Sequence, residues 1–112
     1  MKRTEITKYA NQTFKDKHGH YHICGFLVVS KPKSIMGDYV CLHSLVPKNE
    51  LPKYLRNKIP PNQIWMRYDI YNDPIKRNIT LFEHEEPELK RMLEGMKYKT
   101  AHKWAEMIDG FW

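Results

Sequence analysis

Residues 63–74 read Gln63-Ile64-Trp65-Met66-Arg67-Tyr68-Asp69-Ile70-Tyr71-Asn72-Asp73-Pro74. Within this stretch the sequence pattern changes from one typical of a strand to one typical of the start of a helix. From Gln63 to Ile70, successive side chains alternate between two sets, which predicts a strand with two different faces. The segment Asn72-Asp73-Pro74 then supplies a capping side chain followed by a proline, which is typical of the first turn of a helix. The sequence therefore predicts that strands precede this stretch and that helices follow it.

The first half of the chain has the composition of short strands separated by turns. Three runs rich in β-branched, aromatic and aliphatic residues predict strands at Thr4–Phe14, His20–Ser30 and Tyr39–Val46. A short helix is expected at Glu50–Asn57, with Pro52 tolerated in its first turn.

Two helices are expected in the second half. Five apolar residues fall on one stripe of the first helix, which ends at Gly95: Ile75, Ile79, Phe82, Leu89 and Leu93. Thr100 opens the last helix, on which one face is shared by Ala101, Trp104, Ala105 and Ile108. This order of elements predicts an α+β fold, in which the C-terminal helices pack on one face of a small, mainly antiparallel sheet.

Length and composition narrow the class of protein. The 112 residues are enough for a single domain, residues 1–112, and 41% of them are hydrophobic, as in ordinary globular proteins. No apolar run approaches the roughly 20 residues that cross a bilayer, and the basic N-terminus lacks the apolar stretch of a signal peptide. We therefore expect a cytoplasmic protein without a membrane partner, in which Cys24 and Cys41 are free thiols.

Positive charge is concentrated in the first half of the chain. Residues 1–60 contain eleven Lys or Arg and four Asp or Glu, whereas residues 61–112 contain eight and nine. A basic surface can bind nucleic acid non-specifically through its phosphates. Four lysines flank the expected second strand and are the candidates for such a contact: Lys15, Lys17, Lys31 and Lys33. A solvated lysine-rich surface is the alternative interpretation.

The segment His84-Glu85-Glu86-Pro87-Glu88 has the form HExxE, a variant of the zinc-binding HExxH motif. Residues four apart face the same side of a helix, so His84 and Glu88 are candidate metal ligands, and His102 on the next helix is a candidate third ligand. Glu85 is then placed as the general base for a metal-bound water. The alternative is a solvated acidic helix face with no chemical role.

Pro87 lies inside this motif and removes one helical hydrogen bond. Either the helix kinks there or a new helix begins near Glu86. In the second case His84 and Glu88 need not point the same way.

A second candidate site lies near the first turn. His20 and His22 are two apart on a strand and would share a face, so they are alternative metal ligands. The run His20-Tyr21-His22 also matches the His–hydrophobe–His pattern of rolling-circle replication and transposition nucleases. Those enzymes use a tyrosine nucleophile on a helix, for which Tyr54 is the candidate here. A polar strand end is the alternative interpretation.

From residue 59 onward the chain resembles a family of small, mostly uncharacterised proteins from archaea, bacteria and their viruses. The shared pattern is Ile-Pro-x-Asn-x-Ile-Trp, then His-Glu-x-x-Glu, then Gly-Met-x-Tyr-x-x-Ala-His, which here spans Ile59–Trp65, His84–Glu88 and Gly95–His102. The resemblance covers about half of the chain and implies a zincin-like core in which His84, Glu85, Glu88 and His102 act together.

These observations support three hypotheses from different classes. The first is a zinc-dependent hydrolase of the zincin type, acting on peptides. The second is a non-catalytic module of viral or mobile-element origin that binds nucleic acid or protein. The third is a metal-dependent single-strand nuclease built on His20, His22 and Tyr54.

Overall fold

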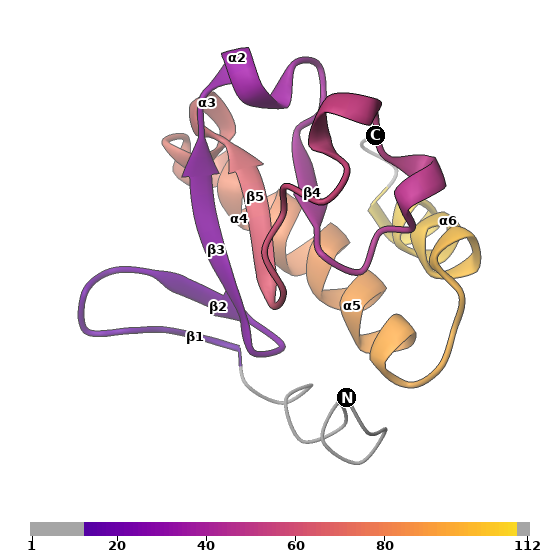
Figure 1. Ribbon diagram of the computed structural model, residues 1–112. Coiled ribbons are helices and arrows are strands. Elements are labelled where there is room, and N and C mark those ends of the chain that lie inside the picture. The colour runs from indigo at the N-terminus through magenta and orange to yellow at the C-terminus, as the bar shows by residue number, and fades with distance from the viewer. Residues whose placement is uncertain (1–12, 110–112) are drawn as a thin grey trace.

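The computed structural model describes residues 13–109 and contains a five-stranded sheet with the C-terminal helices packed on one face (Figure 1). The strands are β1 (Phe14–Lys15), β2 (Tyr21–Ile23), β3 (Phe26–Lys31), β4 (Cys41–His43) and β5 (Gln63–Arg67). The helical segments are α2 (Lys33–Met36), η1 (Lys48–Glu50), η2 (Lys53–Leu55), α3 (Tyr68–Tyr71), α4 (Pro74–Asn78), η3 (Ile79–Glu85), α5 (Glu86–Leu93) and α6 (Tyr98–Asp109).

The predicted α+β class is confirmed. The strand order is β1-β2-β3-β5-β4, and every neighbouring pair is antiparallel except β3 and β5, which are parallel. The segment from α4 to α5 runs behind the strands in Figure 1 and covers one face of the sheet. No helix in residues 13–109 is long and apolar enough to cross a membrane.

The strand predicted at His20–Ser30 is in fact two strands joined by a tight turn. Cys24 and Gly25 have φ angles of 52° and 82°. Positive φ at both central residues is the geometry that matches the twist of a two-residue hairpin. The turn therefore folds β2 back against β3, and the β1–β2 hairpin projects sideways from the sheet (Figure 1). Residues 4–12 of the first predicted strand lie outside the described part.

The transition at residues 63–74 occurs earlier than predicted. The strand ends at Arg67 and the short helix α3 begins at Tyr68, so the strand predicted up to Ile70 is too long. The predicted helix start is confirmed, because Asp73 Oδ1 accepts hydrogen bonds from the backbone N–H groups of Ile75 and Lys76. These bonds satisfy donors that the first turn of a helix leaves without a partner.

The helix predicted from Pro74 to Gly95 contains a π-helical stretch, η3, between α4 and α5. A π-helix has more residues per turn than an α-helix, so it shifts the stripe of apolar residues around the axis. Leu89 and Leu93 are buried as predicted, but Ile75 and Phe82 are 73% and 40% exposed, and Leu81 is buried instead. The predicted buried face of this helix is therefore confirmed for Leu89 and Leu93 and wrong for Ile75 and Phe82.

Both faces of the sheet have an apolar core. Ile64 and Met66 of β5 point toward the helices, in a cluster that includes Val28, Leu81 and Leu89. Trp65 points to the opposite face, in a second cluster whose other buried members are Met36, Leu42, Val46, Leu51 and Leu55. The alternation of side chains along each strand produces these two layers.

Three other predicted elements have different bounds. The helix predicted at Glu50–Asn57 is two short 3₁₀ turns, η1 and η2, with Pro52 between them as the N-cap of η2. The strand predicted at Tyr39–Val46 contracts to β4, and the last helix begins at Tyr98 rather than Thr100. On that helix Ala101 and Ala105 are buried as expected, whereas Trp104 is 47% exposed.

Candidate metal centre

The edge strand β4 directs two reactive side chains toward the helices. Cys41 pairs with Met66 of β5, and His43 pairs with Ile64. Paired residues on neighbouring strands share a face of the sheet, and Ile64 and Met66 face the helices. Cys41 and His43 therefore point into the helical layer, while Leu42 between them faces the other core.

The π-helical segment explains how Pro87 fits into the HExxE motif. η3 ends at Glu85 and α5 begins at Glu86, so Pro87 occupies the first turn of α5, where its missing N–H is tolerated. The helix therefore changes from π to α at Glu86 without a break, since Glu85 and Glu86 both have helical backbone angles. The predicted start of a separate helix near Glu86 is wrong. His84 and Glu88 lie together, because His84 Nε2 is 3.8 Å from Glu88 Oε2.

The turn after α5 brings the last helix back to the motif. Gly95 has a φ angle of 110°, a left-handed conformation that favours glycine, and its N–H donates to the carbonyl of Met92. α6 then packs along α5 and η3. As a result His102 Nδ1 lies 2.8 Å from Glu88 Oε2, although the two residues belong to different helices.

Glu88 is the centre of the resulting cluster. Its Oε1 lies 2.6 Å from His43 Nε2, while its Oε2 faces His102 and His84. The rings of His84 and His102 meet edge to face at 5.3 Å. Side chains from the sheet and from two helical segments, η3 and α6, thus surround the Glu88 carboxylate of α5.

Most of the cluster is shielded from water. His43 and Glu88 are 1% and 2% exposed, and His84 is 6% exposed. The side chain of His102 is 34% exposed and forms the solvent-facing edge. Burial opposes ionisation of Glu88, but hydrogen bonds from His102 and His43 outweigh it and hold the pKa of that carboxyl at about 2. Glu88 is therefore a buried anion at neutral pH.

The pKa of Glu85, which is also buried, is shifted in the opposite direction to that of Glu88. Burial raises its pKa well above the usual value of 4.5, and the charge of Glu88 raises it further, although a hydrogen bond with the Cys41 thiol acts in the other direction. Its Oε2 is buried and has no hydrogen-bond partner within the described residues. Burial and the nearby Glu85 carboxyl likewise raise the pKa of Cys41 well above 9.0.

Two groups of side chains within residues 13–109 could each hold a metal ion. One is His84, Glu88 and His102, and the other is His43, Glu85 and Glu88. In each group the possible ligand atoms lie within 4.8 Å of one another. The three ligands predicted from the HExxE motif and the last helix are thus brought together, and they could hold a metal ion.

Three residues of the centre were not predicted from the sequence. His43 and Cys41 lie in an apolar run that indicated only a strand, although their spacing of two places them on one face. Tyr98 stacks on the ring of His102 with centroids 5.3 Å apart, and it meets His43 edge to face at 6.1 Å. Two signals pointed to Tyr98: it is the tyrosine of the Gly-Met-x-Tyr-x-x-Ala-His pattern, and it stands four residues before His102, a spacing at which side chains meet on a helix.

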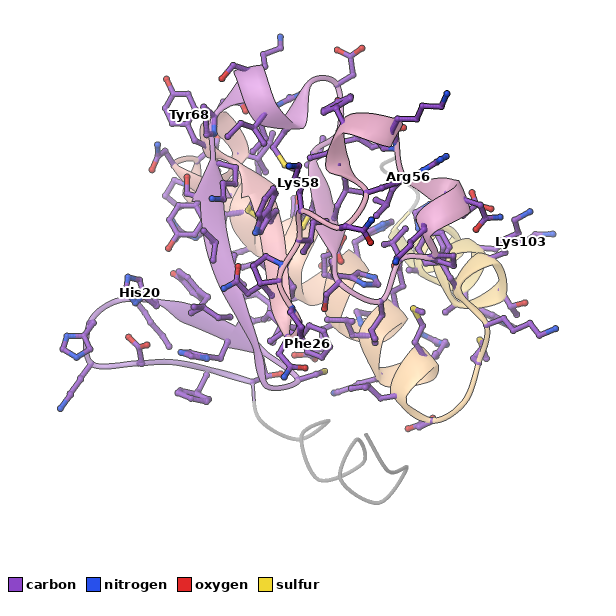
Figure 2. The ribbon with its side chains drawn as sticks, viewed as in Figure 1. His20, Phe26, Arg56, Lys58, Tyr68 and Lys103 are labelled. Atoms are coloured by element: carbon purple, nitrogen blue, oxygen red, sulfur yellow. The ribbon has the colours of Figure 1, made fainter. Side chains whose placement is uncertain are left out.

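The residues of the predicted nuclease site lie in different parts of the fold. His20 and His22 belong to the β1–β2 hairpin, on which Figure 2 labels His20. Asp16 Oδ2 lies 2.8 Å from His22 Nε2 and 3.8 Å from His20 Nδ1. Asp16 also accepts hydrogen bonds from the backbone of His18 and His20, so it organises the turn. Tyr54 lies on η2 with its hydroxyl against Gly37.

The four candidate lysines fall into two pairs. Lys15 and Lys17 are on the β1–β2 hairpin, whereas Lys31 and Lys33 are at the end of β3 and the start of α2. The Lys31 ammonium lies over the ring of Trp65 at 4.5 Å. Nucleic-acid binding by these residues stays a prediction.

Comparisons of the chain with known families, proteins and structures identify no similar protein. The chain matches no family model, no curated protein and no solved structure at a significant level. The resemblance of its C-terminal half to a family of small microbial and viral proteins therefore stays a prediction.

Proposed function

We propose that the protein is a zinc-dependent hydrolase whose ion is bound by His84, Glu88 and His102. The observation that carries this proposal is the convergence of three ligand atoms from three helical segments on a buried site. Two imidazoles and one carboxylate are the ligand set of several catalytic zinc sites, in which a fourth position remains open. Bound zinc would supply a polarised water at neutral pH.

The burial pattern favours a catalytic site over a closed structural one. His102 is the only one of the three ligands with substantial exposure, so solvent and substrate would approach from the α6 side. His84 and Glu88 are held from behind by the packed helices. The ligand set is thus closed on one side and reached by solvent on the other.

Glu85 is the proposed general base. It follows the ligand His84 directly, and one of its carboxyl oxygens has no hydrogen-bond partner within the described residues. The raised pKa of Glu85 in the metal-free protein means that this carboxyl has a high affinity for a proton. The likeness of the motif to HExxH makes a peptide bond the first substrate to test.

Measurement of zinc content and of proteolytic activity tests the proposal. We expect about one zinc per chain, which is the number expected for one three-ligand site. Glu88→Ala and His102→Ala should each lower the zinc content, because each removes one protein ligand. Glu85→Gln should keep the zinc and abolish hydrolysis of a protein substrate. The protein should be purified without an affinity tag containing histidine.

Two control variants match these changes. Glu83→Gln alters an exposed carboxylate on the same helical segment, and His18→Ala removes an exposed histidine from the hairpin turn. Both should leave zinc content and activity unchanged. The proposal is wrong if the chain binds no stoichiometric zinc after zinc is added back, or if Glu88→Ala and His102→Ala bind as much as the parent. That result would leave the non-catalytic binding module as the better hypothesis.

A further inference from the structure

The hydrogen bonds of His43 define which ring nitrogen carries the proton. The backbone N–H of Leu45 donates to Nδ1 at 3.2 Å. A nitrogen that accepts a hydrogen bond has a free lone pair and no proton, so the ring proton of His43 is on Nε2. Nε2 is 2.6 Å from Glu88 Oε1, and Nε2–H therefore donates to this oxygen.

This tautomer makes His43 a poor metal ligand, because the Leu45 N–H occupies the nitrogen to which the proton would have to move. An imidazole binds metal through the lone pair of a nitrogen, and Nε2 has none while it carries the proton. Transfer of the proton to Nδ1 would place two N–H groups, those of His43 and Leu45, against each other. The group of His43, Glu85 and Glu88 is therefore the less favourable of the two possible ligand sets.

We infer that His43 is a positioning residue, which holds Oε1 of Glu88 so that Oε2 alone is directed at the zinc ligands. Oε2 is the oxygen that lies 2.8 Å from His102 Nδ1 and 3.8 Å from His84 Nε2. The proton with which His102 donates to Oε2 would be released when zinc binds. The bond to His43 is almost completely shielded from water, so no water molecule replaces it. This inference rests on the proposed zinc site and adds to it a residue of the sheet, His43, that orients the ligand Glu88.

The position of His43 on β4 gives this support its rigidity. β4 pairs with β5 through Cys41, Leu42 and His43, so its backbone is held by the ladder. The donor to Nδ1 comes from Leu45, in the turn that follows the strand. A chain of hydrogen bonds thus runs from the backbone through His43 to Glu88. Hydrogen-bonded partners of this kind orient metal ligands and raise metal affinity.

Zinc affinity, measured by competition with a chelating dye, is the first test. His43→Leu should weaken zinc binding by about 10- to 100-fold, the usual effect of removing such a partner, without changing the number of ions bound. His43→Gln should retain most of the affinity, because its side-chain amide can still donate to Glu88. Leu42→Ala is the matched control, since Leu42 is buried on the same strand but faces the opposite core. It should lower stability and leave the affinity unchanged.

The protonation of His43, observed by NMR with ¹⁵N-labelled histidine, is the second test. We expect the proton on Nε2 both without and with zinc, and this measurement on the parent protein does not depend on any variant folding. A proton on Nδ1, or metal coordination by His43, would overturn the inference.

The outcomes separate this inference from the zinc proposal. A parent protein that binds two ions, of which His43→Leu loses one, would show His43 to be a ligand and overturn the positioning role. Unchanged affinity in His43→Leu would show that the residue only supports the fold. A parent protein without zinc sinks both proposals, whereas the first two results leave the zinc site intact.

Discussion

Replacement of Glu88 by leucine should destabilise the metal-free protein more than replacement of both Glu88 and His43. The single change leaves the Nε2–H donor of His43 buried without its acceptor, because His43 is 1% exposed. A buried polar group that loses its partner retains the full cost of desolvation. The double change to leucine removes donor and acceptor together and leaves an apolar contact.

The size of the effect follows from the burial of the pair. The two side chains are 1% and 2% exposed and their N–O distance is 2.6 Å. Loss of one partner from a buried pair costs about 3–5 kcal/mol, whereas apolar replacement of both is often close to neutral. We therefore expect Glu88→Leu to cost about 3 kcal/mol or more, and the coupling energy of the double-mutant cycle to be about 2 kcal/mol.

Urea unfolding in the presence of a chelator, followed by circular dichroism, measures the four free energies of unfolding in the cycle. The exposed pair Glu86–Lys90, with an N–O distance of 3.2 Å, is the control, and its coupling energy should be below about 0.5 kcal/mol. A coupling energy for His43 and Glu88 no larger than that of the control would refute the assignment of a buried, charge-assisted hydrogen bond.

Three other predictions concern the same structure under different conditions. Glu85→Met should raise the free energy of unfolding at pH 7, because burial raises the pKa of Glu85 in the folded protein above 4.5 and so disfavours its charged form. Urea unfolding should show that this gain vanishes below pH 4.5, where the carboxyl is protonated in the folded and the unfolded chain. Zinc at 100 times its Kd should raise the stability by about 2.7 kcal/mol, seen as a higher Tm that a chelator reverses. The pKa of Asp16, measured by NMR, should be about 2, below its usual value of 3.8. The stability that Asp16 contributes is therefore present above pH 3.8 and is lost as the pH falls toward 2. His22→Phe should raise that midpoint, since the hydrogen bond with His22 is the main cause of the low pKa, and an unchanged midpoint would contradict this assignment.

The order of strands and helices was predictable because it depends on local signals. Asp73 caps α4 as its type and position predicted, and Gly95 ends the segment that contains α5. The hairpin at Cys24-Gly25 was not predicted, because cysteine rarely adopts positive φ and the run around it is continuously apolar. The π-helical stretch was also not predicted, since a widened turn inside a helix has no sequence signature comparable to a cap.

The candidate centre was predictable where its members share one helix or a recognisable motif. His84, Glu85 and Glu88 follow from the HExxE spacing, and His102 was placed with them because a glycine separates the two helices. His43 was not predicted, because a single histidine in an apolar strand gives no indication of its partner. That partner, Glu88, is 45 residues away in the sequence.

The sequence by itself therefore determined the local elements and the candidate ligands, because capping, alternation and i, i+4 spacing act over a few residues. Only the tertiary structure decided the state of those ligands. The pKa of Glu88 is lowered to about 2 and that of Glu85 is raised well above its usual value, although both are glutamates on consecutive helical segments. The difference arises from long-range contacts, since His43 from the sheet and His102 from α6 both reach Glu88, while burial beside that charge favours the protonated form of Glu85.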